Sequence, residues 1–389
     1  MAQKNKVLLF KGQSQYDVLR YFVDELDTAF QTLGLQTVVI DLLSPNFISE
    51  LQRVFQEGNL LFVLGFNAIG QELQIQGRSI YDMLKLPYVA FFVDHPIYHD
   101  ARLRYSFEYQ LVSFVDQDHL DFLKSYYPNR KHMFFIPHGG SVDPTIRSNS
   151  IPIQKRSIPI LFTGSYKDPD IFLQSINAPE EAIKQIRSIA DIMLADSSAT
   201  VDRATTVYCQ SLGVEPSPTY IPLMQAADMY FRMEKRKRII MSLSELPLTV
   251  LGNGWSQMKI ESKTLKIMPA KSFSEILQLM GDSQIFLSIA PMHRRGTHER
   301  TFCAMLSGAV CVSDKSEYME QHFLNGQEYI GYRAHDPLPD MLASLLDDPA
   351  KMEQIANQGR KQAEQNHTWT NRAVEILRSV KQFLDYKQS

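Results

Sequence analysis

Short apolar runs alternate with amphipathic stretches over the first 138 residues of the chain. Lys6–Phe10 and Thr37–Asp41 have the length and apolar character of buried strands. Between them, residues 16–33 carry apolar side chains at helical spacing, and Gly34 stands where such a helix would end. Further strands are expected at residues 60–64, 88–93, 111–115 and 133–136, with helices at 48–55, 79–84, 101–109 and 120–126. Apolar strands that alternate with helices predict a parallel sheet that is covered on both faces.

The alternation stops after residue 138 and later resumes, which predicts two α/β lobes. Residues 139–157 are polar and punctuated by Gly, Ser and Pro, as is typical of a linker. A second series of strands is expected at residues 158–163, 248–251, 265–267, 285–289, 309–313 and 328–332. We therefore predict the following domains: a first lobe at 1–140, a linker at 141–157, a second lobe at 158–367 with a helical insertion at about 171–246, and a final helix at 368–389 that can pack back on the first lobe.

Composition is that of an ordinary globular protein. The chain has 389 residues, 44 % of them hydrophobic, and a formal net charge of −3, so charge gives no reason to expect a nucleic-acid partner. Cys209, Cys303 and Cys311 show neither a CxxC pair nor metal-ligand spacing, which is typical of free thiols in a reducing compartment. No apolar run approaches the ~20 residues that span a bilayer. The N-terminus leads directly into a strand, so we expect a cytoplasmic protein without a signal peptide.

One strand–loop–helix–strand unit concentrates the candidate chemistry. An apolar run, Ile285–Ala290, precedes a basic loop, and a helical pattern follows from Thr297. The N–H groups at a helix N-terminus, flanked by Arg295 and Arg300, suit a phosphate or diphosphate. Gly296 permits close backbone approach, and Thr297 can cap the helix. The alternative is a capped surface helix whose charged side chains are solvated.

Other candidates follow neighbouring strands and could face a cleft between the two lobes. Thr163–Ser165 and Gly252–Gly254 could bring backbone N–H groups to a diphosphate, or could be ordinary tight turns. Trp255 could stack on a base or belong to the core. The basic run Lys235–Arg238 lies within a helical pattern and is interpreted as a solvated face, with contact to an anionic acceptor or a membrane surface as the alternative.

The run His298–Asp314 resembles the donor-site signature of CgeB-like glycosyltransferases. Four further pieces are similar to that family: Phe91–Pro96, Thr163–Ser165, Leu251–Trp255 and His367–Trp369. The resemblance covers both lobes, and its tight matches lie between residues 250 and 314. It implies the GT-B fold, with two Rossmann-like lobes that face a central cleft. In that class the second lobe binds a nucleotide sugar and the first lobe binds the acceptor.

The resemblance gives expected roles to four other side chains. Many relatives carry a ribose-binding Glu where Cys303 stands, and Glu299, one turn earlier, could take over that contact. Inverting transfer needs a general base on the acceptor hydroxyl, for which Asp94 and His95 are the candidates, whereas retaining transfer needs none. Alternatively, Asp94 caps the next segment and His95 is a polar lining residue.

The function expected is therefore that of a hexosyltransferase-like glycosyltransferase that moves a sugar from a nucleotide-sugar donor to an acceptor. The acceptor, which could be a protein, a polysaccharide or a lipid-linked glycan, is not identified by the sequence, and neither are the sugar, the base, the stereochemistry or the oligomeric state. A nucleotide-sugar epimerase of the same architecture and a non-catalytic sugar-nucleotide-binding protein are the alternatives.

The expected mechanism is electrostatic, with the helix N-terminus and arginines stabilising the departing diphosphate. No Asp-x-Asp pair follows a strand, so we expect transfer without a metal ion, and no cofactor besides the nucleotide-sugar co-substrate. Asp314 and Glu317 could bond hydroxyls of the donor sugar, or could cap the next turn. The expected donor and diphosphate ligands are Thr163, Gly164, Ser165, Gly252, Asn253, Gly254, Trp255, Arg295, Gly296, Thr297, His298, Glu299 and Arg300.

Overall fold

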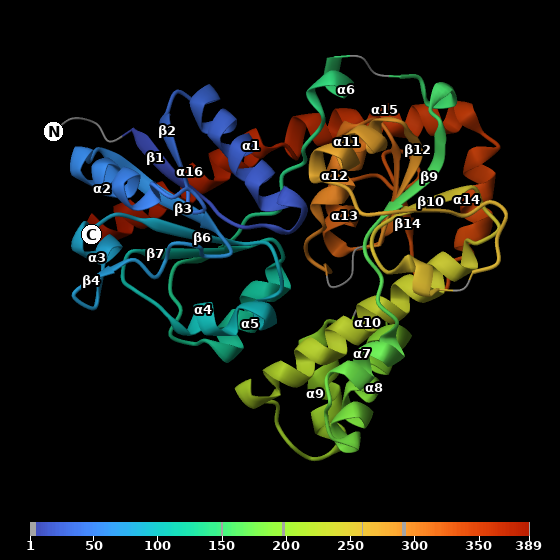
Figure 1. Cartoon of the computed structure of the whole chain (residues 1–389), viewed down its shortest axis with the longest axis horizontal. Helices are drawn as coiled ribbons and strands as arrows, with labels where there is room; N and C mark the ends of the chain where they lie inside the picture. Colours follow the sequence, from blue (N-terminus) through green and yellow to red (C-terminus); the bar gives the residue numbers. More distant parts are fainter. Residues whose placement is uncertain (1–4, 149–150, 197–198, 259, 290–292, 389) are drawn as a thin grey trace. The chain divides into compact units, whose positions relative to one another are not determined.

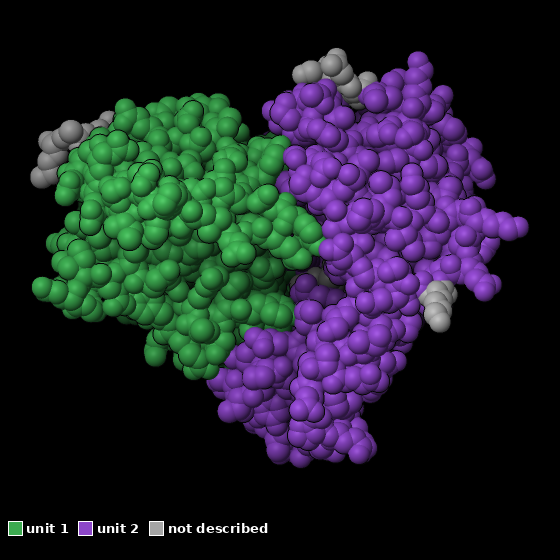
Figure 2. Space-filling model, viewed as in Figure 1, with its two compact units in different colours: residues 1–141, 366–389 green, residues 142–365 purple. Residues whose placement is uncertain are grey.

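The computed structural model describes residues 5–148, 151–196, 199–258, 260–289 and 293–388. Parts of the predictions for the N-terminus, the linker and the apolar run before the basic loop fall on residues 1–4, 149–150 and 290, which lie outside this range. The chain divides into two compact units, residues 1–141 with 366–389 (unit 1) and residues 142–365 (unit 2), as coloured in Figure 2. Each unit contains a six-stranded parallel sheet with helices beside it (Figure 1), so the predicted α/β fold class is confirmed.

The sheet of unit 1 has the strand order β2-β1-β3-β6-β7-β8, and all its pairs are parallel. Its strands are β1 (Lys6–Lys11), β2 (Gln36–Asp41), β3 (Leu60–Phe66), β6 (Tyr88–Phe92), β7 (Gln110–Phe114) and β8 (Met133–Phe135). The central residues of β1, Val7–Phe10, are fully buried, because both faces of the sheet are covered. A short antiparallel pair, β4 (Gln74–Ile75) and β5 (Arg78–Ser79), lies outside this sheet.

The helices of unit 1 connect these strands in the predicted alternation. They are η1 (Gln15–Asp17), α1 (Val18–Thr32), α2 (Phe47–Glu57), α3 (Ile80–Met83), η2 (Pro96–His99), α4 (Asp100–Arg104), α5 (Gln117–Tyr126) and α16 (Trp369–Gln388). The helix predicted at 101–109 ends at Arg104. The buried side chain of Arg130 donates to the carbonyl oxygens of Leu103 and Tyr105, so tertiary hydrogen bonds replace helical ones there.

The C-terminal helix α16 completes unit 1 by packing against α1 and the sheet. Trp369 at its start is 1 % exposed, with its ring 4.7 Å from the ring of Phe22 on α1 and 5.8 Å from that of Phe66 on β3. A bridge between Gly140 and Thr368 joins the end of the β8 segment to this helix. Residues distant in sequence therefore form one core in unit 1.

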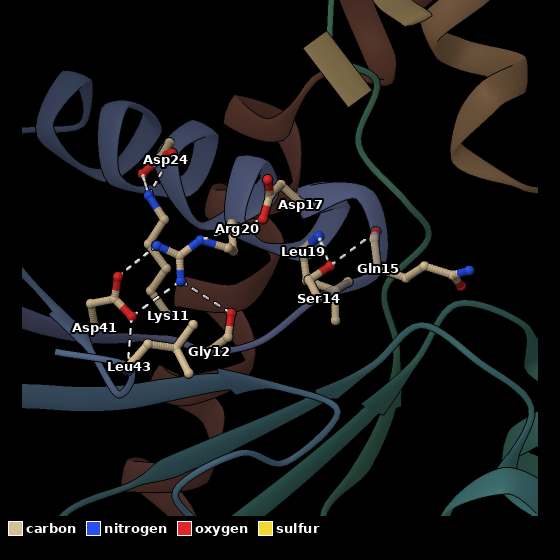
Figure 3. A network of polar contacts seen from close by, with 10 residues as sticks. All are labelled: Lys11, Gly12, Ser14, Gln15, Asp17, Leu19, Arg20, Asp24, Asp41 and Leu43. Carbon is tan, nitrogen blue, oxygen red and sulfur yellow. Dashed lines mark hydrogen bonds and ion pairs between the residues drawn. The ribbon is translucent and has the colours of Figure 1, made fainter. Parts of the chain in front are cut away.

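A polar network joins β1, α1 and the end of β2 in unit 1 (Figure 3). Lys11 donates to both carboxylate oxygens of Asp24 on α1, at 2.5 and 2.7 Å. Arg20, one helical turn away, donates two N–H groups to Asp41, at 3.1 and 2.5 Å, and a third bond to the carbonyl of Gly12. The Arg20 guanidinium is the main cause that lowers the pKa of the Asp41 carboxyl below its usual value.

The sheet of unit 2 has the order β11-β10-β9-β12-β13-β14, and its pairs are also parallel. Its strands are β9 (Ile158–Thr163), β10 (Leu248–Leu251), β11 (Lys266–Met268), β12 (Ser283–Ser288), β13 (Val310–Asp314) and β14 (Ile330–Tyr332). The helices that flank these strands are α6 (Pro144–Ser148), η3 (Ile153–Lys155), η5 (Trp255–Gln257), α11 (Phe273–Gly281), α12 (Glu299–Leu306), α13 (Glu317–His322), α14 (Leu338–Leu346) and α15 (Pro349–Asn366).

The helical insertion lies between β9 and β10. It consists of α7 (Pro169–Ser175), α8 (Glu180–Ala195), α9 (Val201–Ser211), η4 (Pro218–Tyr220) and the long helix α10 (Ile221–Ser242). In Figure 1, α7, α8 and α9 gather around α10, which then leads back to the sheet. Ile240 near the end of α10 is fully buried in the core of unit 2. One end of α10 is therefore part of the sheet's core. Within the described part of the chain, no helix is long and apolar enough to cross a membrane.

Candidate functional site

The unit 2 candidates gather at the carboxyl ends of neighbouring strands. The chain first extends its sheet from β9 to β10 and β11, and then crosses to the other side of β9 to form β12. The strand order therefore reverses at β9, and ligands of doubly wound sheets bind at such a reversal. The loops after β9, β10, β12 and β13 carry the predicted residues, so topology places these four loops at one edge of the sheet.

The turn Thr163–Ser165, which follows β9, is held by three side chains from three different elements. Arg300 of α12 donates to its first carbonyl oxygen. The indole Nε1 of Trp255 donates to the second at 2.6 Å, and Nη1 of Arg236 on α10 donates to the third at 2.9 Å. All three successive carbonyl groups are thus fixed by side chains. Two of the three donors are guanidinium groups, so positive charge is concentrated at this turn.

The two glycines of the Gly252–Gly254 loop are explained by backbone packing. A Cβ atom on Gly252 would lie 2.2 Å from the carbonyl oxygen of Gly164, and one on Gly254 would lie 2.0 Å from that of Tyr166. Gly254 also has a φ of +87°, which L-residues with a Cβ adopt with strain. The sequence left open whether this loop binds a diphosphate or is an ordinary tight turn. The structure shows that both glycines are needed for close packing of the two loops.

The same packing uses the backbone N–H of Gly164, which was expected to face a diphosphate, and that of its neighbour Tyr166. The N–H of Gly164 donates to the carbonyl of Leu251 at 2.8 Å, and the N–H of Tyr166 donates to that of Asn253 at 2.9 Å. The side chain of Asn253 is exposed at the rim of these turns. These two N–H groups are therefore already used within the protein. The groups that the turn after β9 offers to a ligand are the guanidinium groups bound to it.

Trp255 is a core residue rather than an exposed stacking platform. It is 1 % exposed, and its ring stacks on Tyr166 with 5.0 Å between ring centroids and meets Phe162 edge-on at 5.9 Å. Of the two alternatives for Trp255, the structure supports the core residue, because a ring so deeply buried has neither face open to a base. Its function in the site is to anchor the turn through its indole N–H.

The N-cap of α12 is one residue later in the chain than the sequence suggested. The N-cap is His298, whose Nδ1 accepts from the backbone N–H of Arg300 at 3.4 Å. Thr297, predicted to be the cap, is 1 % exposed, and its hydroxyl donates to Thr301 Oγ1 at 3.3 Å. An imidazole nitrogen takes the part usually filled by a hydroxyl or carboxylate, which the sequence pattern did not indicate. Arg295 and Gly296 lie in the preceding loop, half-buried and buried respectively.

Glu299 and its neighbours form a compact charged cluster at this helix start. Glu299 is 6 % exposed, with its carboxylate 2.5 Å from Nδ1 of His298 and 3.7 Å from Nε of Arg300. Cys303, at the position where relatives carry a ribose-binding Glu, is fully buried. Glu299 is therefore already paired with Arg300 and in contact with His298, and a ribose contact through it would compete with these neighbours.

Only part of the basic run on α10 is the solvated face that the sequence suggested: Arg238 is exposed, whereas Lys235 and Arg236 turn inward. Lys235 pairs with Asp314 at the end of β13, at 2.6 Å, and Arg236 reaches the turn after β9. Arg232, one turn earlier, pairs with the fully buried Asp228 at 2.7 Å. The spacing of these residues places them on one stripe of the helix, on which Lys235 and Arg236 reach β13 and the turn after β9. This is the set of candidate residues that sequence reasoning missed.

Burial and like charge both act on the two guanidinium groups at the turn. Burial is the largest cause that lowers the pKa of Arg300. Burial, followed by the positive charges of Arg300 and Arg232, lowers the pKa of Arg236 to about 9. Desolvation and mutual repulsion both destabilise the two guanidinium groups. A bound anion compensates both effects, so the turn favours an anionic ligand.

The candidate sugar-binding residues line a cavity of about 310 Å³ beside this cluster. Its walls come from α10 and from the loops after β12, β13 and β14, and they include Lys235, Asp314 and Glu317. Asp314 is bound by Lys235 and by the hydroxyl of Tyr332, at 3.3 Å. Glu317 is paired with Arg294. Both predicted carboxylates thus border one cavity, each held by a cation.

In unit 1, the two base candidates have opposite environments. The side chain of Asp94 is 55 % exposed, accepts from Nδ2 of Asn67 at 3.1 Å and lies 3.8 Å from Nε2 of His99. His95 is 3 % exposed, and its Nδ1 accepts from the N–H of Ile97 at 3.2 Å, so it caps the short helix η2. The structure therefore leaves Asp94 as the accessible carboxylate and gives His95 a packing and capping role. No cluster of three metal-binding side chains occurs among the residues that the structure describes.

Comparisons with known proteins agree with this architecture. The sequence model of a glycosyl transferase-like family matches residues 234–378, which include the end of α10 and the segment from β10 to α12. No functionally curated protein matches the sequence.

Solved structures match over nearly the whole chain. A sucrose-phosphate synthase from Thermosynechococcus elongatus has a TM-score of 0.54 at 9 % identity, covering 98 % of this chain and 100 % of its own. An α-glucosyltransferase in complex with UDP-glucose and DNA has a TM-score of 0.57 at 13 % identity, covering 97 % and 99 %. The Anabaena protein HepE in complex with UDP-glucose has a TM-score of 0.51 at 12 % identity, covering 97 % and 100 %. These matches establish the GT-B fold that the sequence resemblance implied.

Proposed function

We propose that this chain is a glycosyltransferase that binds a nucleotide-sugar donor in unit 2 and transfers its sugar to an acceptor hydroxyl. The observation that carries the proposal is the guanidinium group of Arg300, held on the turn after β9 at the N-terminus of α12. This is the place in the sheet where ligands of the doubly wound class bind. The matched structures that carry UDP-glucose, and the family match over residues 234–378, support the same assignment.

The chemistry proposed is stabilisation of the leaving group. When the bond between the sugar's anomeric carbon and the diphosphate breaks, negative charge grows on the phosphate oxygens. A fixed guanidinium group and the positive end of α12 stabilise that charge without reorganising. Arg295, in the loop before α12, is proposed as a further cation for the same diphosphate. Because these groups supply positive charge, we propose that the reaction needs no metal ion.

Asp94 is the proposed general base if transfer inverts the anomeric centre. It would take the proton from the acceptor hydroxyl as the new carbon–oxygen bond forms. Its carboxylate is accessible, and Asn67 and His99 hold it in place. For the donor sugar, Asp314 and Glu317 are the proposed ligands at the cavity beside α10. We also propose that the chain is a CgeB-like enzyme and that the transferred sugar is a hexose. The proposed location is the reducing cytoplasm.

Arg300→Gln tests the diphosphate assignment. Loss of a charge-assisted contact should weaken nucleoside diphosphate binding by about 10- to 100-fold, and the loss can be measured by calorimetry or by ligand-induced thermal shift. Unchanged binding in this variant would disprove the assignment. Product analysis separates the alternatives, because an epimerase converts the donor without an acceptor, while a binding protein leaves the donor intact.

A further inference from the structure

In the part of the chain that the structure describes, Arg236 differs from the other arginines of α10 in that it pairs with no carboxylate. Arg232 pairs with Asp228 at 2.7 Å, and Arg238 pairs with Glu234 at 2.7 Å. Among the described residues, Arg236 forms no ion pair, and its hydrogen bond is the one to the carbonyl oxygen of Ser165. Its Nε is buried without an acceptor. A buried guanidinium that lacks an anion is costly, so this position is suited to one that arrives with a ligand.

The surroundings of Arg236 point to the kind of anion. Its guanidinium carbon would lie 3.7 Å from a Cβ placed on Gly164, so it lies directly against the turn after β9. Arg300 donates to the same turn two residues earlier, from a helix that follows β12 rather than from the insertion. The only carboxylate paired with Arg300 among the described residues is Glu299, at 3.7 Å from its Nε. Two forked cations on one turn match a ligand with two adjacent anionic groups, as in a diphosphate.

We infer that Arg236 of the helical insertion binds the diphosphate of the donor together with Arg300, so that α10 is part of the donor site. This rests on the proposed function, which assigns a nucleotide sugar to unit 2. Arg236 would contact the non-bridging phosphate oxygens through the N–H groups that Ser165 leaves available. Asp228 and Arg232 form an ion pair on the same stripe of α10, and the ion pair between Lys235 and Asp314 joins this stripe to β13. The insertion therefore supplies a donor-binding residue in addition to extending the fold.

The test compares Arg236→Gln with Arg238→Gln, an exposed position on the same helix whose loss removes the same charge. Inorganic pyrophosphate and UDP are the probes, uridine is the uncharged control ligand, and affinity is measured by calorimetry with folding checked by circular dichroism. Arg236→Gln should weaken binding of pyrophosphate and UDP by about 10- to 100-fold and leave uridine binding unchanged. Arg238→Gln should bind all three probes as the wild type does.

Each other outcome has a definite meaning. If Arg236→Gln binds pyrophosphate and UDP with wild-type affinity, the inference is wrong while the proposed function stands. Equal weakening of UDP and uridine would also overturn it, because it would show that Arg236 only shapes the turn. If the wild type binds neither pyrophosphate nor any nucleoside diphosphate, the proposed function itself fails. If Arg236→Gln does not fold, Arg236→Lys is the deciding variant, because it keeps the charge but loses the bidentate N–H donors of the guanidinium. About tenfold weaker pyrophosphate binding is expected for it. Wild-type affinity would refute the inference.

Discussion

Replacing Gly254 by Ala should damage both the stability of unit 2 and its anion site. The added Cβ would lie 2.0 Å from the backbone oxygen of Tyr166, well inside van der Waals contact. A backbone atom cannot rotate away as a side chain can, so one of the two loops has to move. Tyr166 directly follows Thr163–Ser165, on which the guanidinium groups of Arg300 and Arg236 are held, and the indole of Trp255 ties the Gly254 loop to the same turn, so movement of either loop disturbs it.

Gly326→Ala provides a matched control for the size of the effect. Gly326 has a φ of +82°, close to the +87° of Gly254, but apart from its chain neighbours no described residue has an atom within 4 Å of the position that a Cβ would take there. Both substitutions therefore carry the same backbone strain of about 1 kcal/mol, and only Gly254→Ala adds the collision. We expect Gly254→Ala to cost about 3–5 kcal/mol in all. For a unit of this size, that lowers the Tm by roughly 6–20 °C, against roughly 2–4 °C for the control.

Differential scanning calorimetry of the three proteins measures the difference, and binding of UDP reports on the anion site. The expected result is a large Tm loss and weaker UDP binding for Gly254→Ala, with little change in binding for Gly326→Ala. Equal Tm losses in the two variants would refute the packing explanation of the Gly252–Gly254 loop.

The remaining predictions concern catalysis, pH and metal ions. Asp94→Asn should lower the rate of an inverting transfer by about 10²- to 10⁴-fold with donor binding unchanged, and a wild-type rate would exclude it as base. Asp41→Asn removes the pair with Arg20 and should lower unfolding stability in urea by about 1 kcal/mol at pH 7. Because Arg20 lowers the folded-state pKa of Asp41, this contribution is present above the unfolded value of about 4 and is lost as pH falls through the folded value. The difference between Asp41→Asn and wild type should therefore shrink below pH 4, and a pH-independent difference would contradict the pairing. Transfer activity should persist in EDTA, whereas strict metal dependence would disprove the metal-free mechanism.

The architecture could be predicted because it depends on local pattern. Buried strands such as β1 are apolar on both faces, and the helices between them carry their apolar residues on one stripe. Strand ends also mark the candidate loops, since the carboxyl ends of parallel strands share one edge. What could not be predicted from the pattern is which face of a polar segment turns inward.

Three residues illustrate this limit. Arg236 lies in a basic run of a long helix, one end of which packs on the other insertion helices and the other on the sheet, so its inward direction depends on tertiary packing. His95 and Trp255 have side chains suited to catalysis and stacking, yet the fold buries both. Burial of a single polar or aromatic residue depends on neighbours distant in sequence, which residue type alone does not reveal.

The most direct test of the central claim is release of a nucleoside diphosphate from a panel of nucleotide sugars incubated with the wild-type protein. If the chain is a glycosyltransferase of the proposed kind, at least one donor is slowly hydrolysed, with its nucleoside diphosphate as product, and Arg300→Gln reduces that release at least tenfold. A protein that binds none of these donors and releases no nucleoside diphosphate from them would contradict the account.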